Sequence, residues 1–244
     1  MNVVEVGVAV VLGAAVAAWY AGAPAAVPVV TGTLLLGVLT LAAVRPGLGW
    51  FGAARTRVDP RGVALTIDDG PHPVTTPALL RVLADAGVHA TFFFLADRAA
   101  AHPELVRATR DAGHEIGLHG LTHSWGLTVW APRRGAVWLG AGRAAVEAAG
   151  AGPITRFRPP FGVVSPRLVA AVRGAGLALT WCSLRTGDGV RIAPETLRRR
   201  LAAARPGDVV LIHDGNPVTA EVLPDVLAAW SRAGLRVGSV AELT

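Results

Sequence analysis

The sequence of 244 residues has no lysine and a single cysteine, and each shortage narrows the classes of protein that it can encode. Cys182 alone cannot form an intramolecular disulfide or a cysteine-rich metal site. It lies on an apolar predicted strand, where we expect a small core residue instead of a nucleophile. All 23 basic residues are arginines, and together with the abundant Ala, Gly and Val this indicates a GC-rich genome and not selection for phosphate binding.

Charged residues make up only 16% of the chain, although the net charge is +6. A nucleic-acid-binding protein would gather its positive charge in a patch, with aromatic side chains between the basic ones. Here the arginines are scattered, apart from residues 133–134 and 198–200 on predicted helices, which are expected to be solvated helix faces. We predict no nucleic-acid partner, and nothing in the sequence implies a protein partner.

Charge is nearly absent from residues 1–44, where Glu5 is the only charged side chain. Two apolar runs, 7–20 and 28–44, are separated by a short break that contains Gly and Pro. A helix made from the second run would be roughly 26 Å long, at the lower end of what the hydrocarbon core of a bilayer requires. We therefore expect residues 1–46 to be a membrane-anchoring hydrophobic segment of one or two helices, a helical hairpin that places the protein at the cell membrane.

Other interpretations of this segment stay open. Ala21-Gly22-Ala23 resembles the cleavage site of a signal peptide, although no basic residue precedes the apolar run. The two runs would alternatively form a buried hairpin inside the globular domain. The side of the membrane on which the following domain lies is also open. The arginines after the second run favour the cytoplasmic side by the positive-inside rule, but the N-terminus would lie outside if only one run spans.

After a predicted linker at 47–60, short apolar runs alternate with helical stretches rich in Ala and Leu. The expected strands are 63–67, 90–95, 115–118, 156–158, 177–182, 208–213 and 236–240. This alternation predicts βαβ units and a parallel sheet, either a small barrel or an open doubly wound sheet, in a globular domain at 61–244. Both architectures place the functional site at the carboxyl ends of the strands.

Ionisable residues follow the predicted strands, as such a site requires. The first strand ends in Asp68 and Asp69, two carboxylates that are costly after a buried strand unless a cation or donor neutralises them. His119 and His123 follow the third strand, and their i, i+4 spacing would direct both rings one way on a helical turn, which suits a shared metal ion. With Asp69 they form a His–His–carboxylate set that leaves positions open for water and substrate. His213 ends a further apolar strand.

The motifs TIDDGP, HGLTH, RPPFG and LIHD, in this order, resemble those of the polysaccharide deacetylase family, also called carbohydrate esterase family four or the NodB-homology domain. The resemblance implies an α/β fold, a distorted (β/α)7 barrel. It also implies that the domain at 61–244 is a catalytic domain, a metal-dependent hydrolase that removes N-acyl groups, N-acetyl above all, from amino sugars of a cell-wall polysaccharide or a lipid-linked glycan. A wall polymer as substrate would require this domain to lie outside the membrane. The alternatives are a deformylase or amidase that acts on another amide, and a non-catalytic membrane-bound glycan-binding protein.

Carried over by position, the resemblance implies that Asp69, His119 and His123 bind a divalent metal ion, Zn²⁺ or a similar one such as Co²⁺. Asp68 would act as the general base toward the attacking water. His213 would act as the general acid toward the leaving amine.

Four further residues have implied roles. Arg158 would pair with the general base, and Asp188 would orient the general acid and raise its pKa. The backbone N–H of Phe161 would help to hold the substrate oxyanion, and Pro160 of the same motif would also contact the substrate.

The sequence departs from the family pattern near the predicted site. Gly120 stands where Ser or Thr is usual, and Gly189 stands where a Trp often lines the sugar groove. The region around Arg185 lacks the usual additional Asp. None of these changes removes a ligand or a proton-transfer residue, so they bear on the identity of the substrate. Three other tryptophans are candidates to line the sugar groove in place of that Trp, but we expect each of them to pack in the core: Trp125, Trp130 and Trp181.

Overall fold

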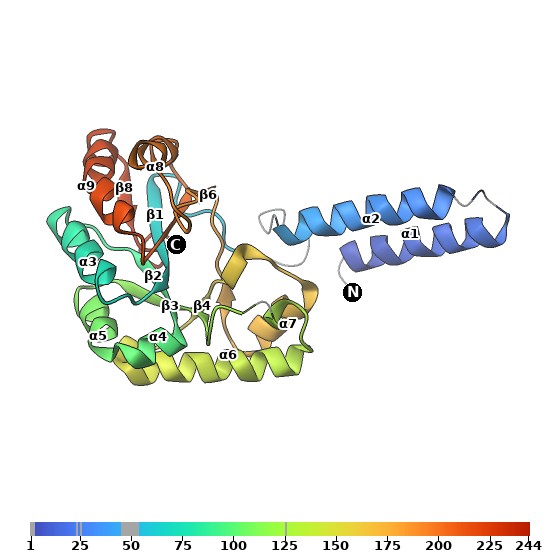
Figure 1. Cartoon of the computed structure of the whole chain (residues 1–244), viewed down its shortest axis with the longest axis horizontal. Helices are drawn as coiled ribbons and strands as arrows, with labels where there is room; N and C mark the ends of the chain where they lie inside the picture. Colours follow the sequence, from blue (N-terminus) through green and yellow to red (C-terminus); the bar gives the residue numbers. More distant parts are fainter. Residues whose placement is uncertain (1–2, 23, 25, 45–53, 125) are drawn as a thin grey trace.

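A curled parallel sheet of eight strands organises the protein in the computed structural model, which describes residues 3–22, 24, 26–44, 54–124 and 126–244 (Figure 1). The spatial order is β5-β4-β3-β2-β1-β7-β6, with β8 paired to β1, and every pairing is parallel. The strands are β1 (Gly62–Gly70), β2 (Thr91–Leu95), β3 (Glu115–Gly120), β4 (Arg156–Phe157), β5 (Ala178–Leu179), β6 (Leu184–Arg185), β7 (Val209–His213) and β8 (Arg236–Gly238). All except β6 fall in predicted strands, which confirms the predicted βαβ organisation.

The curvature of the sheet gives a half-barrel, because the described strands at its two ends do not pair with each other. β5 and β6 contain two residues each, too few to build a ladder across the gap. Residues before β1 lie there instead, where Arg55 bridges Thr180 and Arg57 bridges Asp208. The expected closure into a seven-stranded barrel is thus replaced by an open, curled sheet.

Helices connect the strands and cover the outer face of the sheet (Figure 1). They are α3 (Thr75–Asp85), α4 (Ala96–Ala101), α5 (Pro103–Asp111), α6 (Pro132–Val146), α7 (Pro166–Gly174), α8 (Pro194–Leu201) and α9 (Pro217–Arg232). Proline occupies one of the first two positions of the last five, where a missing backbone N–H costs nothing. The sequence predicts helices near 77–86, 103–112, 132–149, 165–175, 194–204 and 218–233, and these ranges overlap all of the sheet-covering helices except α4.

Alternation along β1 determines which side chains face the interior of the half-barrel. Residues 63, 65 and 67 pack in the larger hydrophobic cluster, against the helices. Ala64 belongs to a smaller cluster with Trp181, inside the curve of the sheet. Because successive side chains of a strand point to opposite faces, Thr66 and Asp68 follow Ala64 on the inner side.

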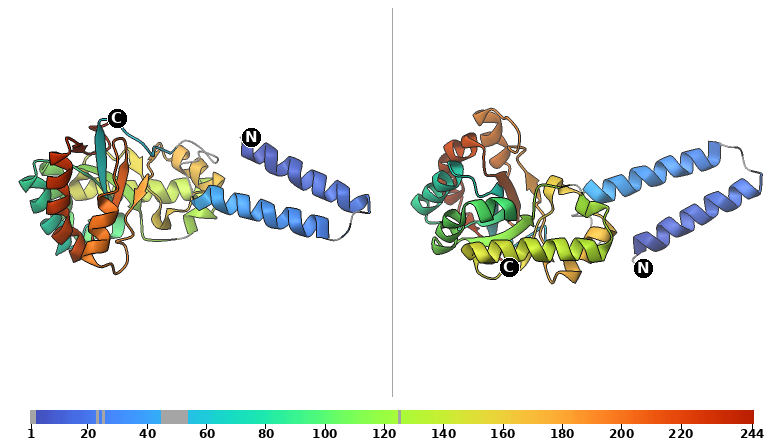
Figure 2. Two further views of the ribbon diagram at one scale, coloured as in Figure 1. Left: turned by 90° about the horizontal axis from the view of Figure 1, so that it is seen from above. Right: turned by 60° about the horizontal axis from the view of Figure 1, so that its bottom comes forward.

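Two apolar helices precede the sheet domain, namely α1 (Val3–Tyr20) and α2 (Ala26–Val44). They lie side by side and project away from the domain (Figures 1 and 2). The end of α2 contacts the domain, since the backbone N–H of Val164 donates to the carbonyl of Ala43 at 3.0 Å. This arrangement excludes the alternative of a hairpin buried inside the globular domain.

The structure does not support the predicted membrane span. Among the described residues, no helix combines the length and the apolar character that crossing a membrane requires. Half of the predicted linker at 47–60, residues 47–53, lies outside the described residues.

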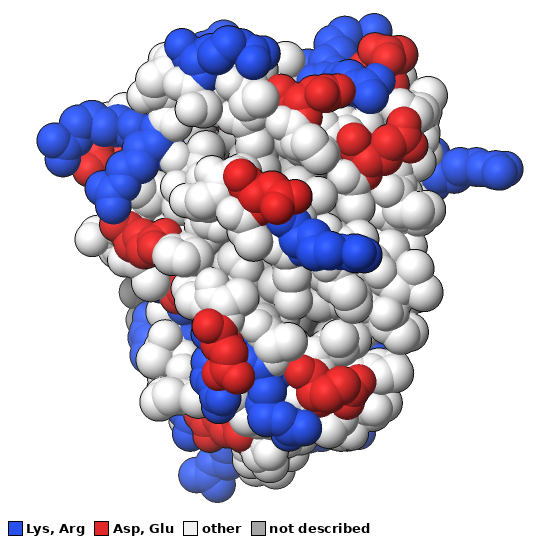
Figure 3. Space-filling model, turned by 90° about the vertical axis from the view of Figure 1, so that its left-hand side faces the viewer, with Lys and Arg blue, Asp and Glu red and all other residues white. Residues whose placement is uncertain are grey.

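Charged side chains of both signs are interspersed on the face at the left of Figure 1, which Figure 3 shows from the front. Such mixing is typical of solvated helix surfaces.

Candidate active site

Two consecutive carboxylates, those of Asp68 and Asp69, line the same cavity at the carboxyl end of β1. On a regular strand they would point to opposite faces. The β1–β2 register is irregular between Asp68 and Gly70, and Asp69 has a φ of 71°, in the left-handed region. An irregularity of this kind turns a side chain toward a new direction, and here it brings the second carboxylate to the side of the first.

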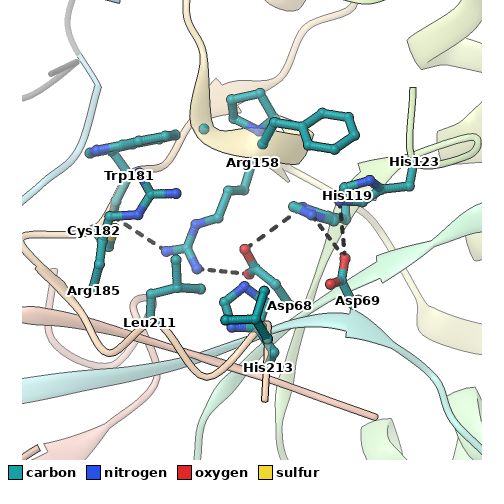
Figure 4. Close-up of a pocket in the computed structure, with 16 residues that line it drawn as sticks. Asp68, Asp69, His119, His123, Arg158, Trp181, Cys182, Arg185, Leu211 and His213 are labelled. Atoms are coloured by element: carbon teal, nitrogen blue, oxygen red, sulfur yellow. Dashed lines mark hydrogen bonds and ion pairs between the residues drawn. The ribbon is translucent and has the colours of Figure 1, made fainter. Parts of the chain in front are cut away.

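Asp69, His119 and His123 converge as the sequence predicted (Figure 4). The Oδ1 atom of Asp69 lies 3.3 Å from Nε2 of His119 and 3.5 Å from Nε2 of His123. Ligand atoms at about 2.0–2.1 Å from a tetrahedral zinc ion are separated from one another by about 3.3 Å, so the spacing fits such an ion. The same Oδ1 is buried and has no hydrogen-bond partner among the described residues. A bound cation would supply the partner that a buried carboxylate oxygen needs.

The charge states of these side chains also suit a cation. Burial opposes ionisation of Asp69, but the nearby imidazoles, His119 foremost, lower its pKa to about 2. Burial lowers the pKa of His123, which keeps a nitrogen lone pair available. A divalent ion would therefore meet an anionic oxygen and a neutral imidazole.

The two histidines do not lie on a helical turn, which corrects the predicted local structure. His119 belongs to β3, and His123 follows in a loop. Gly120 turns the chain between them with a φ of +125°, and a Cβ there would lie 2.9 Å from the Trp138 ring. Glycine therefore fits this position where a larger residue would be strained, because the Trp138 ring of α6 occupies the space.

Asp68 is buried beside the metal ligands and is held by Arg158 (Figure 4). The Nη1 atom of Arg158 donates to Oδ1 of Asp68 at 2.8 Å and to Oγ1 of Thr66 at 2.7 Å. The guanidinium, itself only 1% exposed, also stacks 4.3 Å over the ring of Phe93. The predicted pairing of Arg158 with Asp68 is thus present, and the cation balances the buried carboxylate.

His213 lies at the end of β7 and is oriented by Asp188. Its Nδ1 atom is 2.8 Å from Oδ1 of Asp188, whose Oδ2 accepts the backbone N–H of His213 at 2.9 Å. Hydroxyls of Thr186 and Thr219 donate to the same carboxylate at 2.7 and 2.9 Å. Burial disfavours the imidazolium, but the bond to Asp188 and the charge of Asp68 raise the pKa of His213 above its usual value. Nε2 is left to face the cavity.

The RPPFG motif forms one wall of the cavity. Phe161 has a φ of 60°, and its ring lies 4.1 Å from that of His123. Pro160 is buried and does not line the cavity, so only Phe161 of the predicted substrate-contacting pair reaches it.

The cavity has a volume of about 420 Å³ and contains residues that the sequence did not indicate. Trp181, Cys182 and Arg185 line the wall opposite the histidines (Figure 4). Arg185 lies over the Trp181 ring, with 5.6 Å between the guanidinium carbon and the ring centre. Trp130 packs against Trp138 instead, and Trp125 lies outside the described residues. Trp181 therefore lines the cavity and also packs in the smaller hydrophobic cluster.

A candidate metal site next to a buried acid and a partly buried histidine, at the carboxyl ends of parallel strands, is typical of metal-dependent hydrolases of the α/β type. Comparison with known proteins agrees. Residues 55–180, more than half of the chain, match the family model described as polysaccharide deacetylase. The chain belongs to this family, and it is a polysaccharide deacetylase, a hydrolase of carbon–nitrogen bonds other than peptide bonds.

Particular relatives are similar over most of the sheet domain. The chitooligosaccharide deacetylase of Sinorhizobium fredii is 36% identical over 184 residues, which cover 75% of this chain and 82% of that protein. The peptidoglycan-N-acetylglucosamine deacetylase PgdA of Listeria monocytogenes is 32% identical over 185 residues, covering 74% and 38%. BA3943 from Bacillus anthracis, described as a CE4 family pseudoenzyme, has a similar structure, with a TM-score of 0.73, 26% identity and coverage of 78% and 68%.

Proposed function

We propose that the protein removes N-acetyl groups from amino sugars of a glycan, with a divalent metal ion, Zn²⁺ foremost, held by Asp69, His119 and His123. The observation that supports this is the convergence of that ligand set with Asp68 and His213 in one cavity. The names of the relatives from S. fredii and L. monocytogenes point to N-acetylated sugars as the substrate class.

The ion would serve as a Lewis acid that polarises the amide carbonyl and acidifies the attacking water. Asp68 accepts the proton of that water on its carboxylate. Arg158, at 2.8 Å, keeps this carboxylate in place and balances its charge. A base that is buried and fixed in this way needs little reorganisation during the reaction.

His213 donates a proton from Nε2 to the nitrogen of the leaving amine. Asp188 accepts from Nδ1, fixes the ring and favours the protonated form that an acid must have at the start. The backbone N–H of Phe161, on the wall beside His123, stabilises the developing oxyanion.

Acetate release tests this function directly. Purified protein with zinc is incubated with N-acetylated chitotetraose and, in parallel, with N-formylated chitotetraose and with simple N-acetyl amides. We expect acetate from the oligosaccharide and little product from the simple amides. Turnover of the formyl compound alone, or of the simple amides alone, would favour a deformylase or amidase, and binding of the oligosaccharide without any release would favour a glycan-binding protein.

We also propose that α1 and α2 hold the protein at the cell membrane, a location that the exposed apolar side chains support. Val29, Leu34 and Leu36 are each 66% exposed on α2. Apolar surface of this kind is covered in most proteins by lipid or by another protein.

Fractionation of cells that produce the full chain tests this location. We expect the protein in the membrane fraction, and a shift to the soluble fraction when Leu34→Arg and Leu36→Arg are combined. Val137→Arg, at an exposed apolar position of α6 in the sheet domain, is the matched control and should leave the distribution unchanged. A C-terminal reporter active only in the cytoplasm would exclude an external wall polymer as substrate.

A further inference from the structure

A second cavity of about 400 Å³ adjoins the first on the other side of His213. Asp69, Gly189, Val190 and His213 line both, so the two cavities form one groove that passes the site. Gly189 keeps this passage open, since a Cβ there would lie 3.0 Å from Nε2 of His213. A large side chain at this position would press on His213 and narrow the groove.

Three arginines outside the proposed catalytic machinery line the groove. Arg185 lies on the wall of the first cavity, and Arg98 and Arg191 line the second. None of the three forms an ion pair with a carboxylate within the described residues. This differs from Arg158, whose charge is balanced by Asp68 at 2.8 Å.

Two of these guanidinium groups are held in place by contacts that leave their charge unbalanced. Arg185 lies over the Trp181 ring, with 5.6 Å between the guanidinium carbon and the ring centre. Nη1 of Arg98 donates to the backbone carbonyl of Asp69. A carbonyl oxygen and an aromatic ring orient a guanidinium group without neutralising its charge. Its N–H donors therefore remain available to an anion.

The acids of the groove do not offset this charge. Asp68 and Asp188 are already paired with Arg158 and His213. Asp214 is buried, and its two carboxylate oxygens accept the hydroxyls of Thr75 and Thr76. The remaining carboxylate, that of Asp69, is the proposed metal ligand, and a divalent ion there would add positive charge to the groove.

From this arrangement we infer that the amino-sugar substrate of this protein carries an anionic group close to the N-acetylated residue, a phosphate or a carboxylate, which the groove arginines bind. The inference rests on the proposed function and specifies its substrate class. A neutral sugar offers hydroxyls and amides, which do not require unpaired guanidinium groups. Phosphate and carboxylate accept paired N–H bonds from arginine, and such charge-assisted bonds are about twice as strong as neutral ones.

Three matched substrates test the inference and distinguish the two sources of charge: N-acetylated chitotetraose, its 1-phosphate, and its aldonic acid, which carries a carboxylate. We expect kcat/KM at low ionic strength to be about tenfold higher for one of the charged compounds than for the neutral one. We expect Arg185→Gln and Arg191→Gln each to reduce this ratio severalfold. The preference for the charged substrate in kcat/KM should weaken as salt is added, because salt screens the attraction between the arginines and the anionic group.

Arg81→Gln is the control for the loss of one positive charge, because Arg81 is exposed on α3 and lines neither cavity. Arg185 and Arg191 are more informative than Arg98, since Arg98 touches the backbone of a proposed metal ligand. Equal kcat/KM for the neutral and charged substrates, unchanged in the arginine variants, would overturn the inference while leaving the deacetylase function intact.

Binding separates a failure of the inference from a failure of the proposed function. The fully deacetylated tetrasaccharide and its 1-phosphate and aldonic acid forms cannot be turned over, so calorimetry can measure their affinities whether or not the protein releases acetate. Tighter binding of a charged form that depends on Arg185 and Arg191 supports the inference. Equal affinities that do not depend on these arginines refute it.

Discussion

Asp68 and His213 are register partners on the neighbouring strands β1 and β7. The backbone N–H of Asp214 donates to the carbonyl of Asp68 at 2.8 Å, so the ladder continues to the end of β7. The proposed base and acid are therefore positioned by paired backbone in the centre of the sheet and not by flexible loops. Rigid strands hold such groups more accurately than loops, and this accuracy is what proton transfer needs.

Replacing Asp68 with Asn should reduce kcat by about 10²- to 10⁴-fold, because the amide oxygen is a far weaker base than a carboxylate. Asn has nearly the shape of Asp and can still accept from Arg158. Acetate release from N-acetylated chitotetraose measures the loss.

Metal binding is the control for this variant, because Asp68 is not a predicted ligand. Zinc stoichiometry of Asp68→Asn should match that of the wild-type protein. Activity within threefold of wild type would exclude Asp68 as the base.

Removal of a predicted ligand should act on metal affinity first. His123→Ala deletes one of three atoms that lie within 4.8 Å of one another, and we expect zinc to bind at least about 100-fold more weakly. Competition with a chelator measures this affinity without reference to activity. His102→Ala, at the start of α5 and outside both cavities of the groove, should leave it unchanged. Equal affinities in the two variants would rule out the assigned site.

The sequence was sufficient to predict the strand–helix alternation and the three side chains that converge in the candidate metal site. The apolar strands and the turn residues that bound them are local signals, and ionisable residues at strand ends are conspicuous in a chain with so little charge. The convergence of Asp69, His119 and His123 then follows from parallel topology, since the carboxyl ends of all strands meet at one edge.

Features that depend on contacts distant in sequence were not predictable in the same way. The half-barrel is open because residues near Arg55 fill the place of a ladder between β5 and β6. The HGLTH spacing suggested a helical turn, but the pairing of β3 with β2 extends to Gly120 and imposes a strand on His119. Trp181 and Arg185 reach the cavity because of the curvature of the sheet, which no local pattern encodes.

Asp188→Asn should change the pH dependence of the reaction. Asp188 raises the pKa of His213, and the proposed acid must be protonated, so activity is lost as the pH rises through that pKa. An uncharged partner would lower the pKa, and the alkaline limb of kcat/KM should move to lower pH. The acid limb should move less. A profile of kcat/KM against pH with an unmoved alkaline limb would contradict the assigned role of Asp188.

Gly120→Ser should destabilise the fold, although Ser is common at this position in the family that the motifs resemble. The φ of +125° is costly for any residue with a side chain, and the new Cβ would lie 2.9 Å from the Trp138 ring. We expect a loss of about 1–3 kcal/mol in the free energy of unfolding, measured by urea denaturation. Gly140→Ser is the control, because it lies on α6 with no neighbour within 4 Å and should be neutral or slightly stabilising. Adding Trp138→Ala to Gly120→Ser would remove the clash but not the backbone strain, so the cost of the serine should fall in that background without vanishing. An equally large cost with and without Trp138 would show that the ring is not what excludes a side chain from residue 120.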